Sequence, residues 1–185
     1  MFAFNFNMQQ YDRPLMNKLA GTPAGGGKGL SGIDGAAQAG MIRAELDRLN
    51  PIRKAMVTAS IAPRQVYAGK SDPGKGEWKP NQEWQTAIMM ISWDMASSAL
   101  SGCISNRALR AGIVARCFGA KVNLSELAEY CQVAQNTATN HYQRIRNYLH
   151  GTRGGSGAEP VIGEVRRAMD DIERRLLAAE IIEGE

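Results

Sequence analysis

The sequence predicts an all-α fold, a small domain built from several helices. Apolar residues recur three and four positions apart along most of the chain, which is typical of helices that bury one face. Few segments show the alternation of apolar and polar residues that a half-buried strand requires. The 185 residues, of which 44% are hydrophobic and 22% charged, suffice for one compact domain or two small ones.

The composition also excludes several classes of protein. The chain has no run of about 18 uncharged apolar residues, so we expect no membrane span. Its N-terminus, MFAFNFNMQQYDRPL, lacks the basic start and continuous apolar stretch of a secretory signal, and we expect a cytoplasmic location. The cysteines Cys103, Cys117 and Cys131 form no close pair, which argues against a disulfide framework and a zinc site. We predict no bound metal, and cysteines that fill core space.

Residues 1–35 are predicted to form a flexible N-terminal tail, because they bury too little apolar surface to offset chain entropy. The glycine run around Lys28 suggests a phosphate-binding loop. Such a loop needs a glycine six positions before the lysine and a hydroxyl residue after it, and Thr22 and Gly29 occupy those places. We therefore expect neither a bound nucleotide nor another cofactor.

Residues 36–100 are predicted to be a helical core region. Asn50 is suited to cap a helix and Pro51 to occupy its first position, and Pro63 stops that helix. A helix that precedes Asn50 has its apolar residues at helical spacing. These residues are Ala39, Ile42, Leu46 and Leu49.

Residues 64–80, rich in Gly, Pro and Lys, are predicted to form a loop. From Asn81 a longer helix runs towards Leu100 and is apolar on nearly every side. Such a helix is typical of the centre of a small helical domain, so we expect it to form the core.

Residues 101–150 contain three further predicted helices. Ser105 is expected to cap the first, and Gly119 to end it in a left-handed conformation. Asn123 with Glu126 resembles a capping box and starts a short helix that ends near Cys131. A longer helix from about Asn136 to Leu149 follows a turn. Its expected inward-facing residues are Ala138, Tyr142, Ile145 and Leu149.

The two helices around this turn resemble the helix-turn-helix of DNA-binding regulators, especially the DNA-reading region of sigma factors and similar phage proteins. The matching residues are Leu127-Ala128, Val133 and Thr137-Ala138. The resemblance implies that the second helix enters the major groove of DNA. Gln132 departs from the pattern, because it occupies the turn position usually held by glycine and must adopt a left-handed backbone or force a different turn. The alternative interpretation is an ordinary helical hairpin.

The second helix offers side chains that suit base recognition. Its first turns would direct amide and hydroxyl groups towards the base edges, and an amide matches the donor and acceptor pair of adenine. The expected base-reading residues are Gln135, Asn136, Thr139 and Asn140. The expected phosphate-contacting residues are Lys121, Arg144 and Arg146. His141 is expected to be a partly exposed spacer beside them.

The charge distribution agrees with this interpretation. Residues 101–158 hold seven Lys and Arg against two acidic residues, a net charge of +5, whereas residues 159–185 carry a net charge of −4. A polyanion is expected to bind the basic part of the chain.

Residues 151–159 are predicted to be a linker, and residues 160–185 a C-terminal helix that Glu159-Pro160 opens. The apolar stripe of this helix either pairs two copies as a short coiled coil, giving a homodimer, or packs back on the domain. The residues of the stripe are Val165, Met169, Ile172, Leu176 and Ala179.

The layout as a whole loosely resembles the late-gene antitermination (Q-type) proteins of temperate phages. That resemblance implies binding near a late promoter, with RNA polymerase or its sigma factor as a partner, in a bacterial host. Some members carry a zinc-binding cysteine cluster in a loop, and residues 63–80 contain no cysteine. The sequence thus predicts a sequence-specific transcription regulator of phage or prophage type that binds double-stranded DNA.

The sequence also bears on two other classes of protein. A helical DNA-packaging or adaptor protein, using the same helices within an oligomer, is the alternative. An enzyme is not expected, because the only histidines are His141 and His150 and no Ser-His or Cys-His arrangement stands out.

Overall fold

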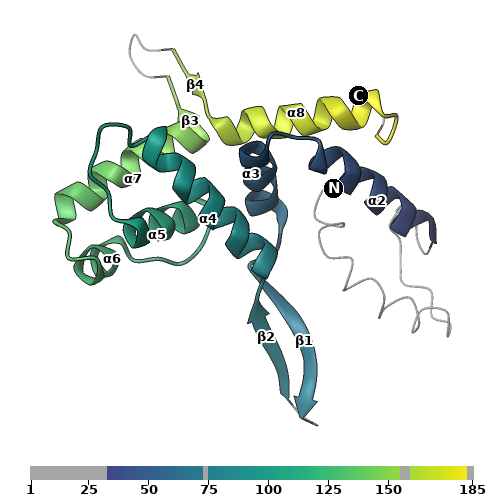
Figure 1. Ribbon diagram of the computed structural model, residues 1–185, viewed down its shortest axis with the longest axis horizontal. Coiled ribbons are helices and arrows are strands. Elements are labelled where there is room, and N and C mark those ends of the chain that lie inside the picture. The colour runs from purple at the N-terminus through teal and green to yellow at the C-terminus, as the bar shows by residue number, and fades with distance from the viewer. Residues whose placement is uncertain (1–32, 73–74, 155–158, 183–185) are drawn as a thin grey trace. The chain divides into compact units, whose positions relative to one another are not determined.

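The computed structural model describes residues 33–72, 75–154 and 159–182 (Figure 1). These residues contain seven helices and two small antiparallel hairpins, so the fold is mainly helical and the expectation of an all-α fold is confirmed only in that coarser form. The chain divides into two compact units, a larger one from Asn50 to Asp170 and a smaller one formed by the chain before and after it. The predicted tail, residues 1–35, lies outside the described residues except for its last three.

The smaller unit contains α2 (Ile33–Asp47) and the second half of α8 (Glu164–Ala178). Nη1 of Arg175 lies 3.7 Å from Oε2 of Glu45, and Nε2 of Gln38 donates a hydrogen bond of 3.5 Å to the carbonyl of Ile181. The buried apolar residues of this unit are Ala39, Leu46, Leu49, Ile172 and Leu176. The predicted stripe of α8 is therefore buried at Ile172 and Leu176 within one chain.

The larger unit is built around α4 (Gln82–Ser97), which packs against α3 (Pro51–Ile61) and α5 (Arg107–Cys117). Ile91 and Met95 of α4 are fully buried, which confirms the prediction of a central core helix. In turn α5 packs against α6 (Leu124–Tyr130) and α7 (Gln135–His150). The other large side chains with almost no exposure in this unit are Met56, Leu100, Leu109, Ile113, Ile145 and Leu149.

Asparagines cap four of these helices. The Oδ1 of Asn50 accepts from the amide of Ile52, and Asn81 and Asn123 cap α4 and α6 in the same way. The predicted cap of α5 was wrong by one residue, because Asn106, not Ser105, accepts from two amides of the first turn. The hydroxyl of Ser105 instead accepts from Arg110. Each cap satisfies an amide that the helix itself cannot pair, which fixes where the helix begins.

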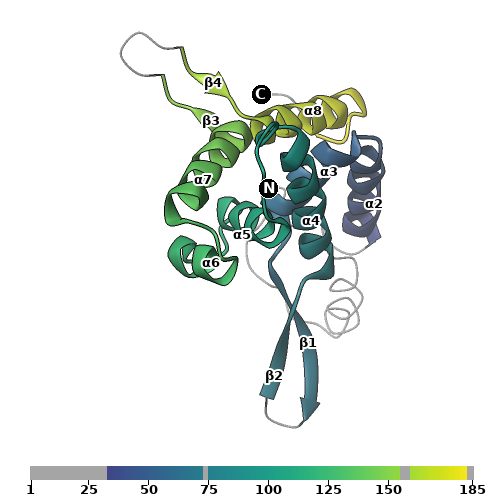
Figure 2. The same ribbon diagram turned by 60° about the vertical axis from the view of Figure 1, so that its left-hand side comes forward.

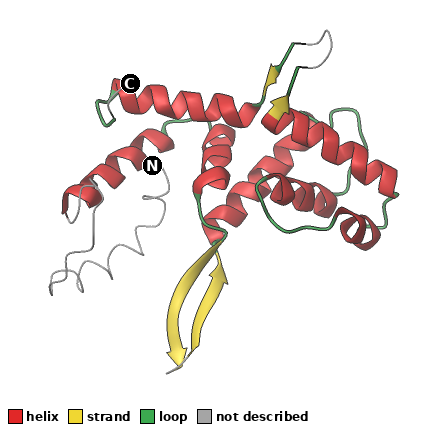
Figure 3. Ribbon diagram, turned by 180° about the vertical axis from the view of Figure 1, so that it is seen from behind, coloured by secondary structure: helices red, strands yellow, loops and turns green. Residues whose placement is uncertain are grey.

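Residues 64–80 are not a loop. They form β1 (Gln65–Asp72) and β2 (Lys75–Pro80), an antiparallel hairpin in which Tyr67 pairs with Trp78 (Figure 3). The glycines and lysines of the segment had favoured a loop. The residues that form strands readily, Val66, Tyr67 and Trp78, lie on either side of an Asp-Pro-Gly-Lys turn sequence and outweigh them.

The predicted linker at 151–159 is also partly ordered. Gly151–Thr152 (β3) pairs with Val161–Ile162 (β4), and α8 begins at Glu164, later than predicted. The backbones cross closely here, because a Cβ on Gly151 would lie 2.0 Å from the carbonyl oxygen of Val161. Gly151 also has a φ of +78°. A glycine is therefore needed where the chain leaves α7.

Among the described residues, no helix combines the length and the apolarity that crossing a membrane requires.

Candidate nucleic-acid interface

The helices α6 and α7 are joined by a short turn, as predicted. After α6 the amide of Val133 donates to the carbonyl of Ala128 at 2.9 Å, and the amide of Gln132 donates to that of Glu129 at 3.0 Å. Gln132 has a φ of +53°, so it adopts the left-handed backbone at the turn position where glycine is usual. Of the two outcomes expected for a residue other than glycine here, Gln132 therefore takes the left-handed backbone.

Small residues allow α6 to pack closely on its neighbours. Ala128 of α6 and Ala138 of α7 are both buried. On the other side of α6, the side chain of Leu127 lies over Gly112 of α5, where a Cβ would be 2.5 Å from Cδ2 of the leucine. The position of α7 on this support therefore depends on side-chain size at a few residues.

The buried face of α7 differs from the predicted one at one residue. Ala138, Ile145 and Leu149 are fully buried as expected, but the fourth member is His141, and Tyr142 is half-exposed. The guanidinium of Arg116 lies over the ring of Tyr142, 5.1 Å from its centroid, which holds the ring at the edge of the core. The expectation that His141 is a partly exposed spacer was wrong.

The opposite face of α7 is polar and exposed. Gln135, Asn136 and Asn140 are exposed, and Thr139 is half-exposed, so all four predicted base-reading residues have solvent-accessible side chains. None of the described hydrogen bonds of this helix engages their side-chain amides.

Two further residues of this face were missed from the sequence. Gln143 and Asn147 are exposed and continue the spacing that starts at Asn136 and Asn140, at three and four positions along the helix. Together Asn136, Asn140, Gln143 and Asn147 form one row, which we call the amide row. Counting the same spacing onward from Asn136 could have found it.

The predicted phosphate-contacting residues flank this row. Arg144 and Arg146 are exposed, and two positions on a helix are separated by about 200° around its axis, which places them on opposite sides of the row. Nη1 of Arg144 donates to Sγ of Cys103 at 2.8 Å. Lys121 is exposed in the loop between α5 and α6 and is not on α7.

Besides Arg144, three of the seven basic residues between 101 and 158 make contacts inside the protein. Arg107 lies over the ring of Trp93, 5.3 Å from its centroid, and Arg110 donates to the carbonyls of Ser92 and Ser105. Arg116 donates to the carbonyl of Val122 at 2.7 Å. Arg110 and Arg116 are half-buried, and the exposed members of the basic block are Arg107, Lys121, Arg144, Arg146 and Arg153.

The three cysteines are half-buried and His141 is buried. Burial raises the pKa of the Cys117 thiol to about 11, which keeps it protonated, and all three cysteines are free and half-buried. Burial also lowers the pKa of His141, and the charges of Arg144 and Arg110 lower it further, so the imidazole is neutral at pH 7. Within the described residues, no group of three His, Cys, Asp or Glu side chains could hold a metal ion.

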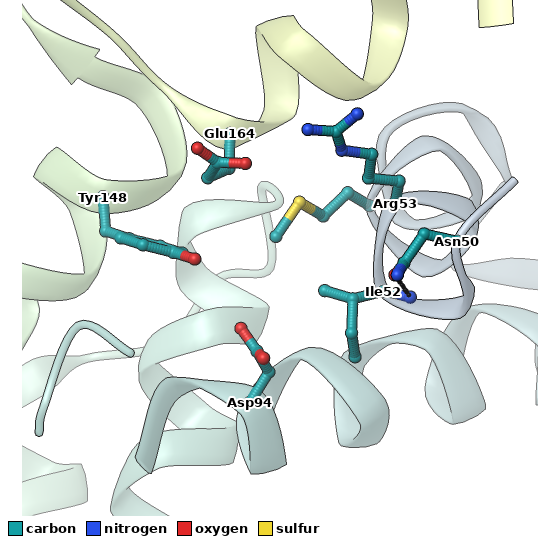
Figure 4. A pocket seen from close by; sticks show the side chains of 7 residues that line it. Asn50, Ile52, Arg53, Asp94, Tyr148 and Glu164 are labelled. Carbon is teal, nitrogen blue, oxygen red and sulfur yellow. Dashed lines mark hydrogen bonds between the residues drawn. The ribbon is translucent and has the colours of Figure 1, made fainter. Parts of the chain in front are cut away.

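An open pocket of about 390 Å³ lies between the start of α3, α4, the end of α7 and the start of α8 (Figure 4). Its carboxylates have partners, since Asp94 accepts from the hydroxyl of Ser98 at 3.2 Å and Glu164 pairs with Arg167 at 2.8 Å. Burial raises the pKa of the Tyr148 phenol between them, which keeps it neutral. The pocket thus presents paired polar groups and no activated nucleophile.

Comparisons of the chain with protein-family models, curated sequences and solved structures gave no match.

Proposed function

We propose that this protein binds double-stranded DNA in a sequence-specific manner, with α6, the turn and α7 acting as a helix-turn-helix. The observation that carries the proposal is the amide row. It lies opposite the buried face of α7, which is apolar at every position except His141. Side-chain amides present a donor and an acceptor together, which is the pattern that reads adenine in the major groove. In this role Gln135, Asn136, Thr139 and Asn140 read bases.

The charges around the row support DNA as the partner. Arg144 and Arg146, on either side of the row, suit the phosphates of the two strands that border a groove, and Lys121 adds a third contact. The first turn of α7 also has no side-chain cap, since its N-cap is Ala134. Its free amides would suit a phosphate oxygen.

We further propose that the protein regulates transcription, with RNA polymerase or its sigma factor as a partner. The likeness of the Leu127-Ala128, Val133 and Thr137-Ala138 pattern to sigma factors and phage regulators supports this finer assignment. Antitermination would be one form of it. The function proposed is binding and not catalysis, which the paired groups of the Tyr148 pocket support.

A salt series with matched variants tests the proposal. The wild type first selects a duplex from a randomised pool. Its affinity for that duplex should fall steeply as salt rises, because protein binding releases cations condensed on the DNA. Arg146→Ala should weaken binding to all duplexes and reduce the salt slope by about one. The control Arg166→Ala removes an exposed arginine from α8, outside the proposed interface, and should leave the slope unchanged. Affinity that does not vary with salt would contradict the proposal.

A further inference from the structure

The hairpin of β1 and β2 projects away from the helices of the larger unit (Figures 1 and 2). It has two strands, and among the residues that the structure describes no other strand pairs with either of its edges. We call residues 64–80 the arm. An extended ribbon with open edges is costly to leave exposed, and a protein usually covers or uses it.

The arm carries a pair of exposed aromatic side chains. Tyr67 and Trp78 face each other across the two strands, with ring centroids 5.5 Å apart and planes at 65°. Trp78 is 61% exposed and Tyr67 41% exposed. Large aromatic side chains bury surface in most folded proteins, and this pair instead forms an apolar patch on the arm.

The charge around the patch indicates its partner. The arm contains four basic residues and two acidic ones by sequence, a net charge of +2. Lys79 directly follows Trp78 and is exposed, and its Nζ lies 3.3 Å from Oε2 of Glu77 on the same strand. Exposed aromatic rings interleaved with lysines are typical of surfaces that contact nucleic-acid bases and phosphates, and a two-stranded ribbon has the width of a DNA groove.

The base of the arm is held against the proposed interface. Nη1 of Arg64 donates to the carbonyl of Gly119, in the same loop as Lys121. Asn81 closes the other end, because its Nδ2 donates to the carbonyl of Pro63 at 2.7 Å while its Oδ1 caps α4. Arg116, near the end of α5, donates to the carbonyl of Val122 in that loop, and its guanidinium lies over the ring of Tyr142 of α7. The arm is therefore fixed to the support of α7 and does not hang from a free loop.

We infer that the arm is a second DNA contact, which grips the same duplex in a groove next to the sequence read by α7. Trp78 and Tyr67 lie against sugars and bases there, and Lys79 lies near a phosphate. The inference rests on the proposed function, and it adds a contact that increases affinity without reading the central sequence. A protein partner for the patch, including a second copy of this chain, is the alternative that the experiment must exclude.

The test uses the full chain and two labelled duplexes. The longer duplex, of about 40 base pairs, carries the selected sequence with both flanks, and the shorter, of about 16, keeps only its centre. Trp78→Ala should weaken binding to the longer duplex by about five- to a hundredfold, the range expected for one stacked base. Its affinity for the shorter duplex should match that of the wild type. Because Trp78 is exposed, its urea midpoint should not change.

Trp93→Ala is the matched control. Trp93 is 59% exposed on α4, outside the arm, and its loss should change neither affinity. If Trp78→Ala binds the longer duplex as the wild type does while Asn140→Ala binds it weakly, the arm inference is wrong and the function of α7 stands. If Trp78→Ala weakens binding and Asn140→Ala and Arg146→Ala do not, the arm binds DNA and the proposed role of α7 is wrong. A wild type that binds neither duplex contradicts both.

Sedimentation of the same variants without DNA excludes the alternative. Wild type and Trp78→Ala should have equal masses. A larger assembly that Trp78→Ala breaks would show that the patch joins copies of the chain, and would overturn the inference.

Discussion

Gln132 holds a backbone conformation that favours glycine, in the turn that sets the angle between α6 and α7. Its φ of +53° brings the Cβ close to the following carbonyl, which costs about 1–2 kcal/mol for a residue with a side chain. The side chain is exposed, so it gains little packing in return. The hydrogen bonds of the turn and the burial of Ala128 and Ala138 offset this cost.

Gln132→Gly should therefore raise the free energy of unfolding by about 1 kcal/mol, after the greater flexibility of glycine in the unfolded chain is deducted. Urea denaturation followed by circular dichroism measures the change. Gln143→Gly, inside α7, serves as the control and should destabilise by a similar amount. A loss of stability in Gln132→Gly would mean that the glutamine side chain stabilises the turn.

His141 gives the protein a predicted dependence on pH. Its Nδ1 is buried without a hydrogen-bond partner, and burial, with Arg144 and Arg110, holds its pKa below the ordinary value of 6.5. The unfolded chain therefore takes up a proton at higher pH than the folded protein does. The free energy of unfolding should fall as the pH drops through about 6.5 towards the lower pKa of the folded state.

Urea midpoints between pH 7.5 and 5.5, about two units around the transition, measure this effect. His141→Phe removes the titrating group and should flatten the pH dependence, whatever its stability at pH 7. His150→Gln changes the exposed histidine at the end of α7, and this variant should keep most of the pH dependence. An equal slope in the wild type and His141→Phe would show that other groups cause the dependence.

At the scale of elements, helix starts were predictable and short strands were not. Asn50 and Asn123 cap helices as expected, and Asn81 caps the helix that was predicted to begin there, because a cap depends on only a few adjacent residues. The arm depends on pairing between residues up to fifteen positions apart, and its glycines and lysines obscured the pattern. The exchange of Tyr142 for His141 on the buried face also has a tertiary cause, since Arg116 occupies the face of the tyrosine ring.

Where β3 and β4 cross, the structure predicts how much an alanine at Gly151 destabilises the protein compared with an alanine at Gly102. Gly151 and Gly102 have nearly the same φ, +78° and +77°, and of these two only Gly151 has backbone atoms where a Cβ would lie. Gly102→Ala should cost only the left-handed penalty of about 1–2 kcal/mol. Gly151→Ala should cost clearly more, because the chain at the end of α7 must move. Thermal and urea unfolding compare the two variants. Equal losses of unfolding free energy would show that the backbone at the crossing moves apart without a free-energy penalty.

At the scale of the whole molecule, the sequence located the candidate interface better than it defined its extent. The exposed residues at the start of α7 follow from helical periodicity alone, so Gln135, Asn136 and Asn140 were predictable. Gln143 and Asn147 belong to the same row but lie beyond the first turns, where no groove contact was expected. The contacts that engage Arg110 with Ser92 and Arg116 with Tyr142 join residues distant in sequence, and only the structure supplies them.

The mass in solution distinguishes a regulator from a packaging protein. The apolar stripe of α8 is buried at Ile172 and Leu176 within one chain, so these two residues are not available to join many copies. Sedimentation equilibrium should therefore give a monomer or a dimer. A closed ring of many subunits would instead favour the packaging or adaptor alternative.

The central claim is that the amide row of α7 reads bases, and a pair of titrations with Asn140→Ala tests it most directly. At one salt concentration, the variant is titrated against the selected duplex and against a scrambled duplex of the same composition. A bidentate amide contributes about 1–3 kcal/mol of discrimination, so affinity for the selected duplex should fall about five- to a hundredfold while affinity for the scrambled one barely changes. Arg146→Ala should lower both together. Equal losses on the two duplexes for Asn140→Ala would contradict the claim and show that α7 positions the protein without reading sequence.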